Sequence, residues 1–352
     1  MGNKESKSVS IPDSDQPDLL STAKDSRHSL SAHPISHPVV HLDPPCTSCR
    51  NELELRFIGI MRSGNHAVIQ WIQQLFHDKK LVFLNNIKHS DHNPFNSFAQ
   101  IEYFGYGNPL SYDELINCSK DVLIYSYEDR RSVQEDGIDF LASVFNEKFE
   151  LKREFYLGAS KQRLDLFVIR DPFNLFASRL QMIRKDPCGG IDLFGLVIEN
   201  WKLLAERIIQ LQQAPAERQI PILYNRLITD ESYQRSIAHR LRGEFVPFSL
   251  QKISEYGLGS SFATFSHLSV SDLFLKAHKL LYLKKWIHVR KHLKRLKRNQ
   301  SSTFLTRWQL LAADKEYRQI FRDPEILYLS ERLFGEIPGT RQFVEQILGN
   351  KE

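Results

Sequence analysis

The feature that most constrains the fold is a strand pattern that runs into a glycine-bracketed loop and then into an amphipathic helix pattern. The apolar run covers residues 55–61, and the loop lies between Gly59 and Gly64. Val68 and Ile72 then begin the apolar face of a helix. A strand, a tight loop and a helix in this order direct backbone N–H groups and the positive end of the helix dipole at an anion. The stretch therefore predicts a phosphate-binding loop within an α/β fold.

The residues after the second glycine distinguish this loop from that of an ATPase or kinase. A nucleotide-hydrolysing loop continues with a lysine that binds phosphate and a serine or threonine that binds magnesium. Here those positions are Asn65 and His66, and the positive charge lies inside the loop as Arg62. The loop suits the binding of an anion and is poorly equipped for metal-assisted hydrolysis of a nucleoside triphosphate, so no metal is predicted.

Short apolar runs alternate with helical patterns along the rest of the chain. Four further runs, each apolar on both faces, lie at residues 81–84, 121–127, 164–169 and 220–224. Such runs are typical of parallel strands covered by helices on both sides. Between the last two runs, apolar residues from Val197 to Leu211 recur at steps of 4, 3, 4 and 3, which is the spacing of one helical face. The alternation predicts a doubly wound α/β domain with a central parallel sheet and a helical C-terminal part.

The N-terminal segment differs in composition from the rest. Residues 1–50 contain ten serines and six of the fifteen prolines, which predicts a disordered tail before a folded domain at residues 51–350. A Cys-x-x-Cys pair and nearby histidines in this tail lack the spacing of known zinc modules. Neither a membrane span nor a secretory signal is recognisable, so we expect a cytoplasmic protein. The opening Met-Gly-Asn-Lys-Glu-Ser fits the pattern for myristoylation of Gly2, which in a eukaryote would promote membrane association.

Positive charge is concentrated in one segment. The chain has a formal net charge of +5, yet residues 273–313 contain eleven Lys or Arg and no Asp or Glu. Apolar residues from Tyr282 to Leu296 step by 4, 3, 4 and 3 between these cations, which predicts a basic amphipathic helix near residues 275–298. Such a helix is suited to an anionic polymer, an acidic acceptor or a membrane surface, with no specific indication of nucleic acid. A helix packed on the body with its lysines in water is the alternative.

A second anion-binding signal follows the predicted strand at residues 164–169. Arg170 leaves this strand, Pro172 fits the first turn of a helix, and Ser178 lies eight residues after Arg170. The proline and the serine are then about two helical turns apart. The guanidinium and the hydroxyl could share one phosphate. A structural Arg-Asp pair that caps the helix is the alternative.

Together, the two loops resemble those of sulfotransferases that use 3'-phosphoadenosine 5'-phosphosulfate (PAPS). In that family the 5'-phosphosulfate loop ends in a basic residue, Ser, Gly and Thr, and the 3'-phosphate element carries an Arg and a Ser eight residues apart. The resemblance covers roughly residues 53–230 and implies a P-loop-like α/β fold that binds PAPS without metal. The residues it assigns to PAPS are Arg62, Ser63, Gly64, Asn65, His66, Ala67, Arg170, Ser178 and Tyr224, the last of which would approach the adenine.

The chain departs from the soluble animal members of that family. The usual threonines of the loop are replaced by Asn65 and His66, and the tryptophan that often stacks on adenine is Ala67. The Arg-Lys-Gly element of those enzymes is absent from the sequence. We therefore expect a divergent member in which base stacking comes from other residues.

Sulfuryl transfer needs a base for the proton of the acceptor and positive charge where the bridging oxygen becomes anionic. Arg62 and the loop amides suit the second role. In the family, the base is a His or Glu at the end of the strand between the two phosphate elements. Glu128 occupies that position here, just after the run at residues 121–127, and the carboxyl end of such a strand faces the ligand crevice.

Other readings of these residues stay open at the level of the sequence. Glu128 and Asp129 could instead pair with Arg130 or Arg131 at the surface, and His66 and His89 are weaker candidates for the base. The predicted function is transfer of the sulfuryl group of PAPS to an acceptor hydroxyl on a small molecule or a carbohydrate. The alternatives are a P-loop kinase or NTPase, and a non-catalytic anion-binding protein whose basic helix binds a polyanion or a membrane.

Overall fold

The computed structural model describes residues 50–87, 98, 100–108, 110–129, 140–145, 147–185, 193–249 and 306–349. Six strands are described: β1 (Arg50–Gly59), β2 (Leu81–Asn85), β3 (Gln100–Phe104), β4 (Lys120–Glu128), β5 (Ala159–Ile169) and β6 (Gln219–Leu223). The helices of the first part of the chain are α1 (Asn65–Leu75), α2 (Tyr112–Asn117), α4 (Phe140–Val144), α5 (Glu147–Leu157), α6 (Pro172–Lys185), α7 (Leu193–Gln213), α8 (Tyr224–Thr229) and α9 (Glu231–Leu241). The C-terminal part contains η4 (Arg307–Leu311), α12 (Lys315–Arg318), η5 (Gln319–Arg322), α13 (Pro324–Phe334) and α14 (Thr340–Gly349).

The strands form one mixed sheet in the order β3-β2-β4-β1-β5-β6. All neighbouring strands are parallel except β2 and β3, which pair antiparallel. The predicted central parallel sheet is therefore confirmed. The edge strand β3 was not predicted, because its sequence Gln-Ile-Glu-Tyr-Phe contains no continuous apolar run.

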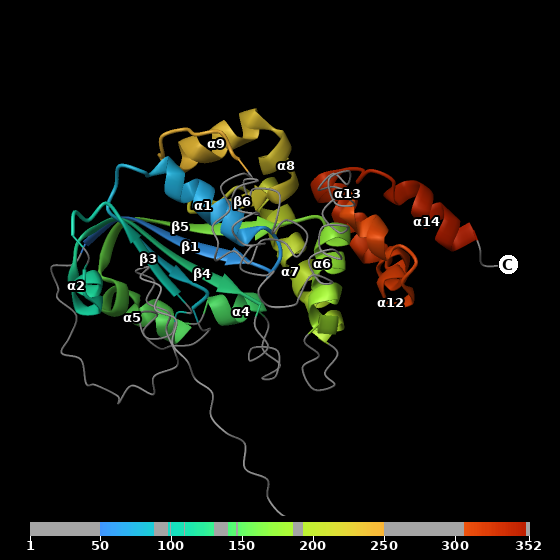
Figure 1. The fold of residues 1–352 in the computed structure, drawn as a ribbon, viewed down its shortest axis with the longest axis horizontal. Coiled ribbons are helices and arrows are strands. Elements are labelled where there is room, and N and C mark those ends of the chain that lie inside the picture. Colours follow the sequence, from blue (N-terminus) through green and yellow to red (C-terminus); the bar gives the residue numbers. More distant parts are fainter. Residues whose placement is uncertain are drawn as a thin grey trace, which may run out of the picture.

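Helices cover both faces of the sheet, as the doubly wound prediction requires (Figure 1). Leu55 and Phe57 of β1 belong to a buried cluster with the apolar residues of α1 and α9. Ile58, whose side chain points to the opposite face, belongs to a second cluster with α6 and α7. The helix predicted around Val197 is confirmed as α7, and its apolar stripe is buried in this second cluster.

The predicted helical C-terminal part is confirmed as well, and it packs against α6. Tyr317 donates from its hydroxyl to the Phe173 carbonyl over 2.7 Å, and the Phe173 ring stacks on Phe321 with centroids 4.7 Å apart. The backbone N–H of Trp308 donates to Asn174 Oδ1 at 3.1 Å. These contacts connect residues more than a hundred positions apart in the chain.

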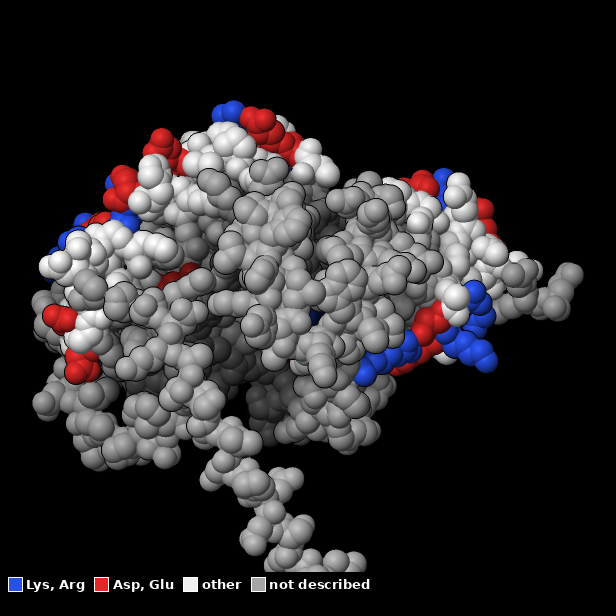
Figure 2. Space-filling view, in the orientation of Figure 1, with Lys and Arg blue, Asp and Glu red and all other residues white. Residues whose placement is uncertain are grey.

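Several predictions concern residues that the structure does not describe. Of the tail predicted at residues 1–50, residues 1–49 lie outside the described part of the chain, whereas Arg50 is the first residue of β1. The basic helix at 275–298 and His89 also lie outside the described part. Among the described helices, none has the length and apolarity to cross a bilayer. On the face shown in Figure 2, described acidic and basic side chains lie next to one another over α9 and over the C-terminal helices. Ion pairs on the protein surface include Arg235 with Glu231 and Arg184 with Asp314.

Candidate functional site

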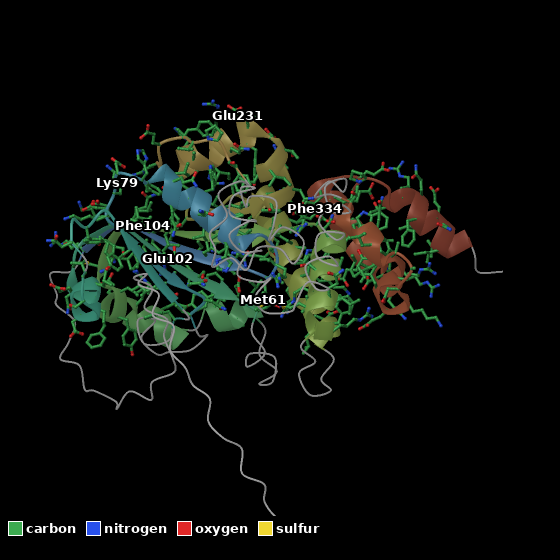
Figure 3. All side chains as sticks on the ribbon, in the orientation of Figure 1. Met61, Lys79, Glu102, Phe104, Glu231 and Phe334 are labelled. Atoms are coloured by element: carbon green, nitrogen blue, oxygen red, sulfur yellow. The ribbon has the colours of Figure 1, made fainter. Side chains whose placement is uncertain are left out.

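The candidate site lies at the carboxyl end of the parallel strands. The strand register pairs Gly59 at the end of β1 with Glu128 of β4 and with Val168 of β5, so the three strand ends are level. Met61, in the loop after β1, lies at this end of the sheet, whereas Phe104 lies at the other (Figure 3). In open α/β sheets this is the end that binds ligands.

The loop after β1 is a tight turn that contains left-handed backbone. Ser63 donates its N–H to the Ile60 carbonyl at 3.0 Å. Two residues of the loop have left-handed backbone, Arg62 with φ 78° and Gly64 with φ 93°. At Gly64 glycine is also required by space, because a Cβ would lie 2.3 Å from the Tyr224 ring. Arg62 is not a glycine, and a non-glycine residue held in this region costs on the order of 1–3 kcal/mol, a strain typical of functional sites.

Buried polar atoms without a hydrogen-bond partner gather at this loop. Within the described structure they include Arg62 Nε, Ser63 Oγ and Asn65 Oδ1. A buried polar group left unsatisfied costs about 1–3 kcal/mol. Two of the three, the Arg62 N–H and the Ser63 hydroxyl, are donors, so a bound anion would satisfy them.

Asn65 connects the loop to the predicted base. Its side-chain amide donates to Glu128 Oε1 at 2.8 Å and to the Ile60 carbonyl at 3.1 Å. The side chain that replaces the P-loop lysine is therefore turned toward β4 and the loop backbone. Glu128 itself is buried, with 6% of its surface exposed, and lies beside the loop as the sequence predicts.

Asp129 holds the first part of the loop. Its Oδ1 accepts the Met61 N–H at 2.6 Å, and its Oδ2 accepts from Arg179 Nη2 at 2.8 Å. Burial raises the pKa of the Asp129 carboxyl to about 6, against the opposing effects of Arg179 and the Met61 N–H. Both Glu128 and Asp129 are buried. Arg130 and Arg131, the partners in the ion-pair alternative, lie outside the described residues, so that alternative stays open.

Arg179 is a residue that the sequence analysis missed. It lies on α6 directly after Ser178 and is 5% exposed. Burial and the Arg179 guanidinium both lower the pKa of Arg62, and Glu128 opposes this shift. A single arginine in an amphipathic helix carries no sequence signal, because its partner Asp129 is fifty residues away.

Arg170 reaches the loop from the end of β5. Its Nη1 donates to the Arg62 carbonyl at 3.5 Å, and its guanidinium carbon lies 5.6 Å from the centre of the Tyr224 ring. The helix-capping alternative also has a counterpart in the structure, because Asp171 Oδ1 accepts the Asn174 N–H at 2.8 Å. Asp171 Oδ2 lies 3.9 Å from Arg170 Nε, within ion-pair range and beyond hydrogen-bond distance.

The other predicted site residues occupy different positions. Ser178 is buried in α6, six residues after Pro172. His66 is half-buried in the first turn of α1, and Ala67 packs in the core cluster under α1. Tyr224, predicted as the end of a strand, is the first residue of α8 and is 4% exposed. The structure thus brings Arg62, Gly64, Asn65, Glu128, Arg170 and Tyr224 together through direct contacts.

The chain was compared with known proteins and structures. No protein-family model matches the sequence, and neither does any curated protein. Among solved structures, it is similar to mouse sulfotransferase SULT7A1 complexed with PAP, at 12% identity and a TM-score of 0.33, over 60% of this chain and 65% of that protein. It is also similar to the sulfotransferase domain of the Synechococcus PCC 7002 olefin synthase, at 12% identity and a TM-score of 0.33, over 59% of this chain and 81% of that domain. This chain spans just under two thirds of the mouse protein, and similarities this weak carry no conclusion about its activity.

Proposed function

We propose that the protein is a sulfotransferase that binds PAPS without a metal ion and transfers its sulfuryl group to an acceptor hydroxyl. The observation that carries the proposal is the group of buried donors at the loop after β1. Arg62 Nε and Ser63 Oγ have no partner within the described structure, and Arg170 reaches the same loop from β5. An anionic ligand with two separate charged groups fits this arrangement.

In this proposal the two phosphate elements bind the two ends of the nucleotide. Arg62, Ser63 and the backbone N–H groups from Gly64 to Ala67 would bind the 5'-phosphosulfate at the start of α1. Arg170 and Ser178 would bind the 3'-phosphate. Tyr224, which packs between Gly64 and Arg170, would approach the adenine.

Glu128 is proposed as the general base. The oxygen of the acceptor hydroxyl would attack sulfur while its proton passes to the Glu128 carboxylate, and the bond from sulfur to the bridging phosphate oxygen would break. Negative charge then develops on that bridging oxygen, where Arg62 and the loop N–H groups stabilise it. The hydrogen bond from Asn65 holds the carboxylate beside the loop, so base and donor group would be positioned by one element.

For the acceptor we propose a hydroxyl on a small molecule or a carbohydrate. The basic segment at residues 275–298 would contribute to binding an acceptor that is anionic. A cytoplasmic location, with membrane association if Gly2 is myristoylated, also belongs to this proposal.

The P-loop kinase or NTPase is less well supported. The position of the phosphate-binding lysine is Asn65, and its amide is hydrogen-bonded to Glu128 and Ile60. His66 stands where such enzymes place the hydroxyl that binds magnesium.

The test is nucleotide binding, followed by transfer. Calorimetric titration with 3',5'-adenosine bisphosphate (PAP) and with ATP plus magnesium should show tighter binding of PAP by about tenfold or more, the effect of one well-placed phosphate contact. Sulfuryl transfer from PAPS to a panel of hydroxyl acceptors should persist in EDTA. Preferential binding of ATP, or an activity that EDTA abolishes and magnesium restores, would turn the assignment toward phosphoryl transfer. Binding of PAP without transfer to any acceptor would favour the non-catalytic alternative.

A further inference from the structure

The proposed function assigns no role to Arg179, although this residue, like Arg62 and Ser63, has a buried donor atom. Within the described structure, Arg179 Nε is a buried N–H without a hydrogen-bond partner, like Arg62 Nε and the Ser63 hydroxyl. Two of these three donors belong to the loop, and the third belongs to a residue that is joined to the loop through Asp129. The unsatisfied atoms elsewhere in the described structure are Asn51 Oδ1 in β1, Arg163 Nε in β5, and Trp308 Nε1 and Ser330 Oγ in the C-terminal part.

The position of Arg179 is set by two elements. It follows Ser178 on α6, and since a helix turns about 100° per residue, the two side chains leave the helix in different directions. The Arg179 side chain is 6% exposed, and its Nη2 donates to Asp129 at 2.8 Å. The same carboxylate accepts the Met61 N–H, so the guanidinium is held at the start of the anion-binding loop.

The number of N–H donors on the Arg179 guanidinium explains why a ligand is expected here. A guanidinium has five N–H donors, and a carboxylate that also binds a backbone N–H cannot satisfy them all. Two guanidinium groups, those of Arg62 and Arg179, lie close enough for one to lower the pKa of the other. Keeping two like charges close together in a buried site is unfavourable, and a tetrahedral oxyanion between them would offset both the repulsion and the unmade hydrogen bonds.

We propose that Arg179 binds the group that is transferred: with Arg62 and Ser63 it donates to the sulfuryl oxygens of PAPS, while Asp129 orients its guanidinium. Arg170 and Ser178 bind the far end of the nucleotide, so Arg179 discriminates PAPS from PAP, which lacks the sulfuryl group. This inference rests on the proposed function. The sequence indicated only Arg62 as a cation that contacts the transferred group. The inference adds Arg179 as a second one.

The experiment measures the dissociation constants of PAPS and PAP for wild type and variants by calorimetry. Arg179→Gln should weaken PAPS binding by about 10- to 100-fold, the range for losing a hydrogen bond to a charged group, and should leave PAP binding within about threefold of wild type. Arg179→Lys keeps a positive charge opposite Asp129 but removes the Nε–H. It should show the same selective loss, and it decides the matter if the glutamine variant does not fold.

Arg184→Gln is the matched control. Arg184 lies on the same helix, but its side chain is 44% exposed and pairs with Asp314 and Glu316 at the surface. This variant should bind both nucleotides like wild type. Equal weakening of PAPS and PAP in the Arg179 variants, or no weakening, would overturn the inference and leave the proposed function standing. Wild-type protein that binds neither nucleotide would overturn the proposed function and this inference with it.

Discussion

Two buried clusters of charged residues lie on the same sheet, and they differ in how completely their polar atoms are satisfied. The first, here called the inner network, is centred on Glu54 and Arg56 within β1, with partners from β4, β5 and α5. Glu54 is fully buried and accepts from the hydroxyls of Tyr125 and Ser160, each at 2.6 Å. It also pairs with Arg153.

The other half of the inner network is centred on Arg56. Arg56 donates from Nε to Asp165 at 2.8 Å, pairs with Glu150, and lies 4.2 Å from the centre of the Phe145 ring. Glu150 accepts two N–H groups of Arg163 at 2.7 and 2.8 Å. The Nε of this arginine, which makes no hydrogen bond, still lies 3.6 Å from Glu54.

The site at the carboxyl end of the sheet contains the same residue types, but more of its hydrogen-bond donors lack a partner. Arg62, Ser63 and Arg179 each have a buried donor atom without a partner within the described structure. Within the described structure the inner network contains one such donor, Arg163 Nε, and it lies beside the Glu54 carboxylate. The site contains three, and in the proposed function these donors bind a ligand. Burial of charge alone would not have separated the two clusters.

The largest effect expected from this difference is loss of turnover at the site. Glu128→Gln keeps the shape of the side chain but removes the proton acceptor, so turnover should fall by about two to four orders of magnitude with PAP binding intact. Steady-state kinetics and calorimetry on the folded variant measure both quantities. Near-normal turnover would exclude Glu128 as the base, and His66 would then be tested in the same way.

A glutamate-to-glutamine substitution in the inner network should instead lower the stability of the protein and leave its turnover unchanged. Glu54→Gln breaks a buried carboxylate–guanidinium pair, and the free energy of unfolding should fall by about 3–5 kcal/mol. Denaturant unfolding measures this loss, and turnover per folded molecule should match wild type because Glu54 lies within β1 away from the loop. A loss of turnover without a loss of stability would mean that the inner network belongs to the active site.

Asp129 should give the stability of the protein a pH-dependent component. The pKa of folded Asp129 is raised to about 6 from an ordinary value of 3.8, so the folded state binds this proton more tightly than the unfolded state. The resulting stability is fully present below about pH 4 and is lost as the pH rises through about 6, by roughly 3 kcal/mol at most. Asp129→Asn should remove this component from unfolding curves measured between pH 4 and 8. The exposed control Asp113→Asn should retain it, and an unchanged profile in Asp129→Asn would assign the titration to another group.

The smallest expected effect concerns the far end of the nucleotide. Arg170→Ala should weaken PAP binding by about 1.5–3 kcal/mol, the range for a hydrogen bond to a charged group. Calorimetry checks this, with Arg240→Ala on the exposed part of α9 as the control that should bind PAP like wild type. If Arg170→Ala binds PAP as tightly as wild type, Arg170 is the structural residue that the capping alternative describes.

The sequence by itself determined the elements that depend on local pattern. Parallel strands buried on both faces need continuous apolar runs, and glycine adopts left-handed backbone without strain, so the central strands, α1, α7 and the loop at Gly64 could all be predicted. The position of Glu128 and Arg170 at this end of the sheet could be predicted as well, because each follows an apolar run whose carboxyl end faces the crevice. The role of Glu128 as the base came from the family resemblance and stays a prediction.

Only the tertiary structure decided which side chains meet. The side-chain amide of Asn65 is bonded to Glu128, sixty-three residues away, and Arg179 is held by Asp129, fifty residues away. The edge strand β3 likewise pairs by its backbone with β2, which its polar alternation does not reveal. Hydrogen bonds and ion pairs of this kind depend on where distant segments are brought together, and neither composition nor periodicity encodes that distance. The unsatisfied donors at the site could therefore be recognised only from the tertiary structure.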